Sequence, residues 1–115
     1  MTKREVCECI SKTGIIPAVR VQSTEDAHFA AECVIDAGIP IVEITMTVPE
    51  AVQLIAQLAS RHPQLAVGAG TVLDTETARR CVDAGAKFLT APGFDASLIE
   101  FAARQGIAVL PRAHA

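Results

Sequence analysis

Five short apolar runs alternate with stretches of helical periodicity, and this alternation most constrains how the chain folds. Continuous apolar runs are typical of strands buried on both faces, as in a parallel sheet covered by helices. The expected strands are residues 15–19, 39–45, 65–67, 87–90 and 107–110. The pattern therefore predicts an α/β chain of four and a half strand–helix units, with parallel strands and short loops.

A repeat within the sequence indicates which type of α/β fold to expect. Asp36-Ala37-Gly38 and Asp83-Ala84-Gly85 each close a helix and open a strand, and they lie 47 residues, or two units, apart. Such a repeat suits a β/α barrel or a doubly wound sheet. A doubly wound sheet predicts a glycine-rich loop after the first strand. Residues 20–23 contain no glycine there, so we favour the barrel.

The length sets how much of a barrel the chain supplies. A closed (β/α)8 barrel, or TIM barrel, typically takes about 250 residues, whereas this chain has 115. We predict the N-terminal half of such a barrel as one partial domain, residues 1–115. It comprises a leading helix at 2–13, βα units at 14–111 and an atypical tail at 112–115. Two sheet edges would stay open, so we expect a fragment or a chain that associates.

Charge and composition exclude several classes of protein. The net charge of −3 offers no basic footprint for nucleic acid. No apolar run approaches the ~18 residues of a membrane span, and the charged N-terminus does not resemble a secretory signal. We therefore expect a cytoplasmic protein that contacts neither nucleic acid nor membrane. In that compartment its four cysteines are expected to be reduced thiols. Their spacing fits no metal site, so we expect them to be structural, and we expect no metal or cofactor.

Glu43 is the one charged residue in the apolar run 39–45. Burying a carboxylate costs free energy unless it is paired or used. A tuned carboxyl group of this kind suits general acid–base catalysis near neutral pH. We therefore predict that Glu43 is a catalytic residue.

Other polar residues fall where a barrel would place its active site, at the carboxyl ends of strands. Thr47 fits a capping box with Glu50 as well as it fits a ligand-binding group. Thr71 could simply satisfy backbone groups of its turn, and Arg20 could be a surface residue. The set comprises Arg20, Glu43, Thr45, Thr47, Thr71 and Thr90, with Pro92 just beyond.

Four motifs carry a resemblance to a known family, and their order and spacing fit up to about Pro111. They are Ile16-Pro17-Ala18-Val19-Arg20, Val42-Glu43-Ile44-Thr45, Gly68-Ala69-Gly70-Thr71-Val72-Leu73 and Ala91-Pro92-Gly93. The chain resembles the N-terminal half of the 2-keto-3-deoxy-6-phosphogluconate (KDPG) / 4-hydroxy-2-oxoglutarate (KHG) aldolases. These are class I aldolases with a β/α-barrel fold, so the resemblance agrees with the predicted fold.

The resemblance implies reversible cleavage of a 2-keto-4-hydroxy acid to pyruvate and an aldehyde. A lysine forms a Schiff base with the keto carbon, and Glu43 lies where the family has its proton-transferring glutamate. Thr71 corresponds to a pyruvate contact, Arg20 to a holder of the anionic substrate, and Pro92 to a residue lining the pocket. The resemblance also implies a homo-oligomer, a trimer for the complete barrel.

The chain departs from the family in its binding and catalytic groups. Many members have an arginine where this chain has Thr47. The Schiff-base lysine belongs on a sixth strand, and none of the lysines present (Lys3, Lys12 and Lys87) lies where it could take that role. We therefore expect this chain to be inactive alone.

The C-terminal end departs as well. The family usually continues Pro111 with a glycine, whereas this chain ends in Arg112-Ala113-His114-Ala115. We therefore expect a truncation or a change of reading frame at that point.

Two further hypotheses stay open. The chain could be a non-catalytic half-barrel that self-associates as a binding or assembly module. It could also belong to another phosphate-handling barrel enzyme, such as a decarboxylase or an epimerase, that uses Glu43 differently. Such enzymes commonly bind phosphate after strands seven and eight, which are absent from this sequence.

Overall fold

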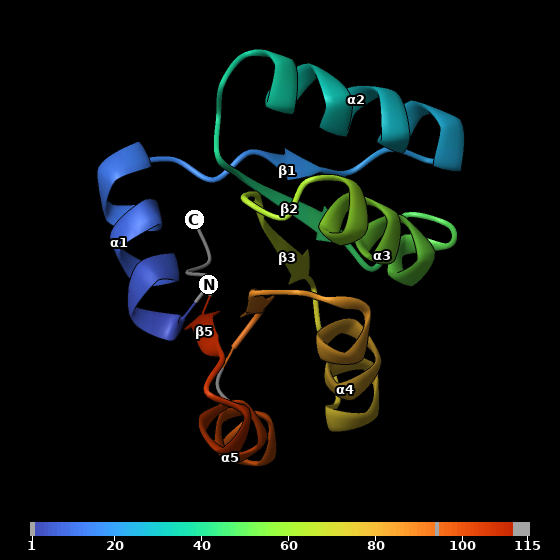
Figure 1. Cartoon of the computed structure of the whole chain (residues 1–115). Coiled ribbons are helices and arrows are strands. Elements are labelled where there is room, and N and C mark those ends of the chain that lie inside the picture. Colours follow the sequence, from blue (N-terminus) through green and yellow to red (C-terminus); the bar gives the residue numbers. More distant parts are fainter. Residues whose placement is uncertain (1, 94, 112–115) are drawn as a thin grey trace.

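A computed structural model of the chain describes residues 2–93 and 95–111 (Figure 1). Its five strands are all parallel and form one sheet in the order β1-β2-β3-β4-β5. The strands are β1 (Ala18–Val19), β2 (Ile41–Thr45), β3 (Ala66–Gly70), β4 (Phe88–Ala91) and β5 (Ala108–Pro111). The helices are α1 (Lys3–Thr13), α2 (Thr24–Asp36), α3 (Ala51–Arg61), α4 (Thr75–Ala84) and α5 (Ala96–Gln105). The predicted parallel α/β chain is confirmed.

The strand order agrees with a barrel. Each strand pairs with its neighbours in sequence, whereas a doubly wound sheet reverses its order at a switch point. In Figure 1 the helices α2 to α5 follow one another around the outside of a curved sheet, while α1 lies across its other side. The described chain is therefore an arc of a β/α barrel.

The two faces of the sheet bury two different sets of side chains, because successive residues of a strand point to opposite faces. The outer face packs against the helices through residues such as Val42, Ile44 and Leu89. The inner face carries a smaller cluster, against which helix α1 packs. Its buried members are Val6, Ile41, Ala66, Phe88 and Ala108. Helix α1 thus covers apolar side chains that point to the inside of the arc.

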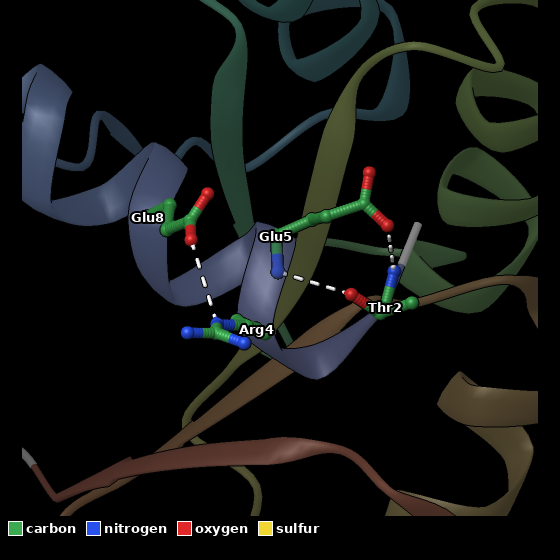
Figure 2. A network of polar contacts seen from close by, with 4 residues as sticks. All are labelled: Thr2, Arg4, Glu5 and Glu8. Atoms are coloured by element: carbon green, nitrogen blue, oxygen red, sulfur yellow. Dashed lines mark hydrogen bonds and ion pairs between the residues drawn. The ribbon is translucent and has the colours of Figure 1, made fainter.

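Polar contacts at the start of α1 fix its first turn, and Figure 2 shows them. Thr2 and Glu5 form a reciprocal capping box, in which each side chain accepts a hydrogen bond from the backbone N–H of the other. Arg4 and Glu8 lie one turn apart with 3.7 Å between Nε and Oε1. Both side chains of this second pair are exposed, so the capping box contributes more to the helix than the ion pair does.

Two of the strands differ in length from the prediction. The first strand was expected over residues 15–19, but β1 contains only Ala18–Val19. Pro17 has no N–H to donate to a ladder, although its carbonyl still accepts from Glu43 N at 2.9 Å. The third strand was expected to end at Val67, but β3 continues to Gly70, whose carbonyl accepts from Met46 N at 2.8 Å. Backbone pairing with β2 therefore extends the strand through its glycines.

The predicted capping box at Thr47 is also wrong. Helix α3 begins at Ala51, its N-cap is Glu50 with φ 58°, and no side chain caps it. Val48 N donates to the Thr45 carbonyl at 3.0 Å, so a tight turn separates the strand from the helix. Thr47 lies within that turn, and its hydroxyl contacts the Thr45 hydroxyl instead of capping the helix.

In the described part of the chain, residues 2–93 and 95–111, no helix is long and apolar enough to cross a membrane. The predicted atypical tail, 112–115, lies outside the described residues.

Strand β3 presents almost no side chain to the inner face. Its inward residues are Ala66, Gly68 and Gly70, and larger side chains of the neighbouring strands occupy the space above them. A Cβ atom at Gly68 would overlap the ring of Phe88, and one at Gly70 would lie 2.5 Å from Oε2 of Glu43. The absence of side chains on β3 therefore makes room for residues from β2 and β4.

We predict that Gly68→Ala destabilises the chain by about 1–3 kcal/mol, because the added methyl group overpacks the cluster around Phe88. Urea unfolding monitored by circular dichroism measures the change. Gly93→Ala is the matched control: a Cβ there meets no atom within 4 Å, so its effect should stay within about 0.5 kcal/mol. Equal effects of the two substitutions would contradict the packing described for β3.

Candidate active site

Glu43 lies in the middle of β2 with its side chain 1% exposed. It shares the inner side of the strand with Ile41 and Thr45, as the alternation of side chains along a strand requires. The Thr90 hydroxyl, from β4, donates a hydrogen bond of 2.7 Å to Oε1 of Glu43. Two buried polar residues from alternate strands therefore meet inside the arc.

Burial dominates the protonation of Glu43. Loss of contact with water raises the pKa of its carboxyl group above the ordinary value, while the Thr90 hydrogen bond and the positive charge of Arg20 lower it by less. A carboxyl group whose pKa moves toward neutrality exchanges protons more readily at physiological pH. The setting of Glu43 thus suits a general acid–base.

Arg20 follows β1 directly, at the carboxyl end of that strand. Strand β1 pairs with β2 so that Ala18 stands opposite Glu43. The guanidinium group is exposed, yet its charge acts on the Glu43 carboxyl group. The structure therefore brings Arg20 and Glu43 to the same edge of the sheet, as the sequence predicted for residues at strand ends.

A short chain of hydroxyl groups links β1 to the loop after β2. The Thr45 hydroxyl donates to the Val19 carbonyl at 3.1 Å and lies 2.8 Å from the Thr47 hydroxyl. A carbonyl only accepts, and a hydroxyl has one hydrogen to give, so Thr47 must be the donor to Thr45. Thr47 is exposed, and this hydrogen bond holds its side chain against Thr45.

Thr71 and Pro92 occupy the loops after β3 and β4. Thr71 has φ 57°, which is unusual for a β-branched residue and often marks a functional site. The next residue, Val72, donates its N–H to the Thr90 carbonyl at 3.1 Å, so this loop is tied to β4. Pro92 is exposed and lines a shallow cavity of about 190 Å³ with residues including Leu98. The lining of this cavity does not include Glu43.

Thr90 is the residue whose role the sequence did not identify. It was visible only as one of several threonines near strand ends. Its separation from Glu43, 47 residues, equals that of the Asp-Ala-Gly repeat. That equality was the signal that could have linked the two. Within residues 2–93 and 95–111, no group of three His, Cys, Asp or Glu side chains could hold a metal ion.

A family model described as KDPG and KHG aldolase matches residues 6–114. The chain belongs to this family. KHG/KDPG aldolase of Escherichia coli K12 is 32% identical over 105 residues, which are 90% of this chain and 49% of that protein. Two solved structures of KDPG aldolases are similar as well.

The first structure is KDPG aldolase of Legionella pneumophila with pyruvate captured as a covalent carbinolamine. It superposes with a TM-score of 0.76 at 30% identity, over 87% of this chain and 48% of that one. The second is the enzyme of Zymomonas mobilis ZM4 with 3-phosphoglycerate. It superposes with a TM-score of 0.82 at 30% identity, over 98% of this chain and 54% of that chain. The chain spans about half the length of the curated relatives it matches, as predicted for the N-terminal half of a KDPG/KHG aldolase barrel.

The raised pKa of Glu43 makes a prediction about stability. The folded chain binds this proton more tightly than the unfolded chain does, so the acid's contribution to stability falls as pH rises from the unfolded pKa through the folded pKa. Glu43→Gln removes this penalty. The variant should therefore gain stability relative to the wild type as pH rises above the ordinary glutamate pKa of 4.5, by about 1.4 kcal/mol for each unit by which the pKa is raised.

Urea unfolding at several pH values measures this difference. Asp74→Asn supplies a control of opposite sign, because hydrogen bonds from Thr77 lower the pKa of Asp74. That variant should lose stability relative to the wild type at neutral pH, and the loss should shrink as pH falls. A difference between Glu43→Gln and the wild type that stays constant with pH would contradict the raised pKa.

Proposed function

We propose that the chain is the N-terminal half of a class I aldolase that splits 2-keto-4-hydroxy acids, such as KDPG or KHG, into pyruvate and an aldehyde. The observation that carries this proposal is Glu43, a buried acid hydrogen-bonded on the inner face of a half-barrel. Family membership supplies the reaction class. The substrate is a small 2-keto acid, and the complete protein is a cytoplasmic homo-oligomer, a trimer as the resemblance implies.

In the proposed reaction a lysine amine adds to the keto carbon and water leaves, which gives a Schiff base. Glu43 then takes the proton of the 4-hydroxyl group, through water, as the bond between carbons 3 and 4 breaks and the aldehyde departs. The electron pair of that bond forms an enamine, and Glu43 returns a proton to its carbon. Hydrolysis of the resulting imine releases pyruvate and the lysine. The carbinolamine captured in the Legionella relative supports this type of chemistry.

The lysine has to come from outside this sequence. Lys3 and Lys12 belong to α1, and Lys87 precedes β4 at the amino end of the strand. Arg20 and Thr71 instead lie at the carboxyl ends of β1 and β3, and the Glu43 side chain leans toward that end of β3. The separation of the lysines from these groups supports our expectation that the chain alone does not turn over substrate.

We assign substrate contacts to the other predicted residues. Arg20 binds the anionic group of the substrate, because it lies at the carboxyl end of β1 and its charge acts on Glu43. Thr71 contacts the pyruvate part from its left-handed turn, Thr47 accepts a hydrogen bond at the mouth, and Pro92 lines the entrance. No metal takes part in this mechanism.

Borohydride trapping tests the missing lysine. We predict that the 115-residue chain incubated with pyruvate and sodium borohydride gains no pyruvate-derived mass, because none of its lysines reaches the site. Intact-mass spectrometry makes the measurement, with E. coli KHG/KDPG aldolase as the positive control. A stable adduct on Lys3, Lys12 or Lys87 would refute this prediction.

A chimera tests the proposed activity itself. We would join the chain to the second half of the E. coli relative, which supplies the remaining strands. We predict lyase activity on KDPG or KHG and a borohydride adduct on the added half. Glu43→Gln in the chimera should lower kcat by about 10²–10⁴-fold, the range of a lost general acid–base. A folded chimera that traps pyruvate but is unaffected by Glu43→Gln would refute the role of Glu43.

A specific observation also favours the second hypothesis, a self-associating half-barrel. Within the described residues, β1 and β5 are the outermost strands of the sheet. A groove of about 260 Å³ runs beside α5 and β5, lined by residues that include the exposed Ile99. Light scattering distinguishes the self-associating half-barrel from half of an enzyme. A discrete, well-folded dimer favours the assembly module, whereas aggregation favours half of an enzyme.

A further inference from the structure

We propose that Thr90 is the positioning residue of this site: its hydroxyl holds one carboxylate oxygen of Glu43 so that the other lies at the mouth end of β3. The inference rests on the proposed acid–base role of Glu43. It assigns a function to a buried threonine that takes no part in the chemistry itself.

The geometry of three neighbouring strands carries the inference. In the register of the sheet, Glu43 of β2 stands opposite Gly68 of β3, and Gly68 stands opposite Phe88 of β4. The Glu43 side chain nevertheless leans toward the carboxyl end of β3, where a Cβ at Gly70 would touch its Oε2. Thr90, two residues beyond Phe88, donates to Oε1 there. The hydrogen bond thus fixes the direction in which the side chain leans.

The two carboxylate oxygens consequently differ. Oε1 accepts from Thr90 inside the arc, and Oε2 lies over Gly70, the last residue of β3. A carboxylate transfers protons efficiently only when the correct oxygen faces the substrate. Thr90 selects that oxygen by binding the other one.

The groups around Glu43 determine how much the Thr90 hydrogen bond changes the pKa of its carboxyl group. Among the described residues that shift the pKa of Glu43, Arg20 contributes a positive charge from the segment after β1. Strand β3 offers only Gly68 and Gly70 nearby, β4 offers the neutral Thr90, and α1 contributes Val6 and Cys9 to the inner cluster. The Thr90 hydrogen bond and the charge of Arg20 therefore both oppose the effect of burial on the pKa of Glu43.

The repeat explains why this pair exists. Glu43 and Thr90 are 47 residues apart, so they occupy equivalent positions in two successive double units. Alternate strands of a β/α barrel contribute side chains to the same interior layer. One copy of this position thus carries the acid, and the other carries its hydrogen-bond donor.

NMR titration of the 115-residue chain with 13C-labelled glutamate carboxyl groups tests the inference, because it reads Glu43 without requiring turnover. Thr90→Val keeps the shape and removes the donor. We predict that it raises the pKa of Glu43 by about one unit, which is about tenfold in proton affinity. Thr90→Ser retains the hydroxyl and should restore the wild-type titration.

Thr45→Val is the matched control. Thr45 is buried on the same side of β2, but its hydroxyl donates to Val19 rather than to Glu43. Its loss should leave the Glu43 titration in place. An unchanged titration in folded Thr90→Val, or an equal shift in Thr45→Val, would overturn the proposal. If Thr90→Val does not fold, Thr90→Cys takes its place, with a weaker donor and a smaller upward shift expected; no shift would again overturn it.

The chimera separates this inference from the proposed function. If Thr90→Val shifts the Glu43 titration but the chimera has no lyase activity, the positioning contact stands and the aldolase role falls. If the chimera is active, Thr90→Val should lower kcat with little change in KM and move the acidic limb of its pH profile upward, while Thr90→Ser should restore both. An active chimera whose kcat and pH profile ignore Thr90→Val would refute the positioning role.

Discussion

The close approach of the Glu43 side chain to the backbone of β3 is the contact on which the rest of the site depends. Gly70 leaves space for the carboxylate, and Gly68 leaves space for the Phe88 ring. With side chains at these positions, β2 and β4 could not meet across the strand between them. The two glycines therefore leave space for one layer of side chains that spans three strands. That space accommodates the acid of Glu43 on the inner face.

This arrangement has an energetic cost that is offset only in part. Burial disfavours the ionised form of Glu43, while Thr90 and Arg20 favour it by less, so the pKa stays above its ordinary value. In a purely structural acid, more hydrogen bonds or a closer cation would remove the imbalance. An incompletely compensated carboxyl group is what proton transfer near neutral pH needs, and proteins commonly give up stability at such sites.

The sequence predicted the parallel strands, their helices and the burial of Glu43, because each follows from a local pattern. The prediction from sequence failed where contacts with residues distant in sequence determine the structure. Backbone pairing with β2 lengthened β3 through its glycines. Thr47 contacts the Thr45 hydroxyl and does not cap helix α3, because a turn separates Thr47 from the start of the helix. Thr90 looked like any threonine at a strand end, because its partner lies on another strand. Whether the predicted site residues bind substrate stays a prediction.

The position of Arg20 couples substrate binding to proton transfer in the proposed reaction. Its cation lowers the pKa of Glu43 in the free chain, and the same cation is the group we assign to the substrate anion. A bound anion would neutralise much of that charge, which removes its effect on the carboxyl group and raises the pKa of Glu43. Thr47 offers an acceptor rather than a second cation, so it cannot take over this charge. The Thr90 hydrogen bond, which does not depend on that charge, continues to favour the ionised base. The ionised base is the form that must accept the proton of the substrate hydroxyl group.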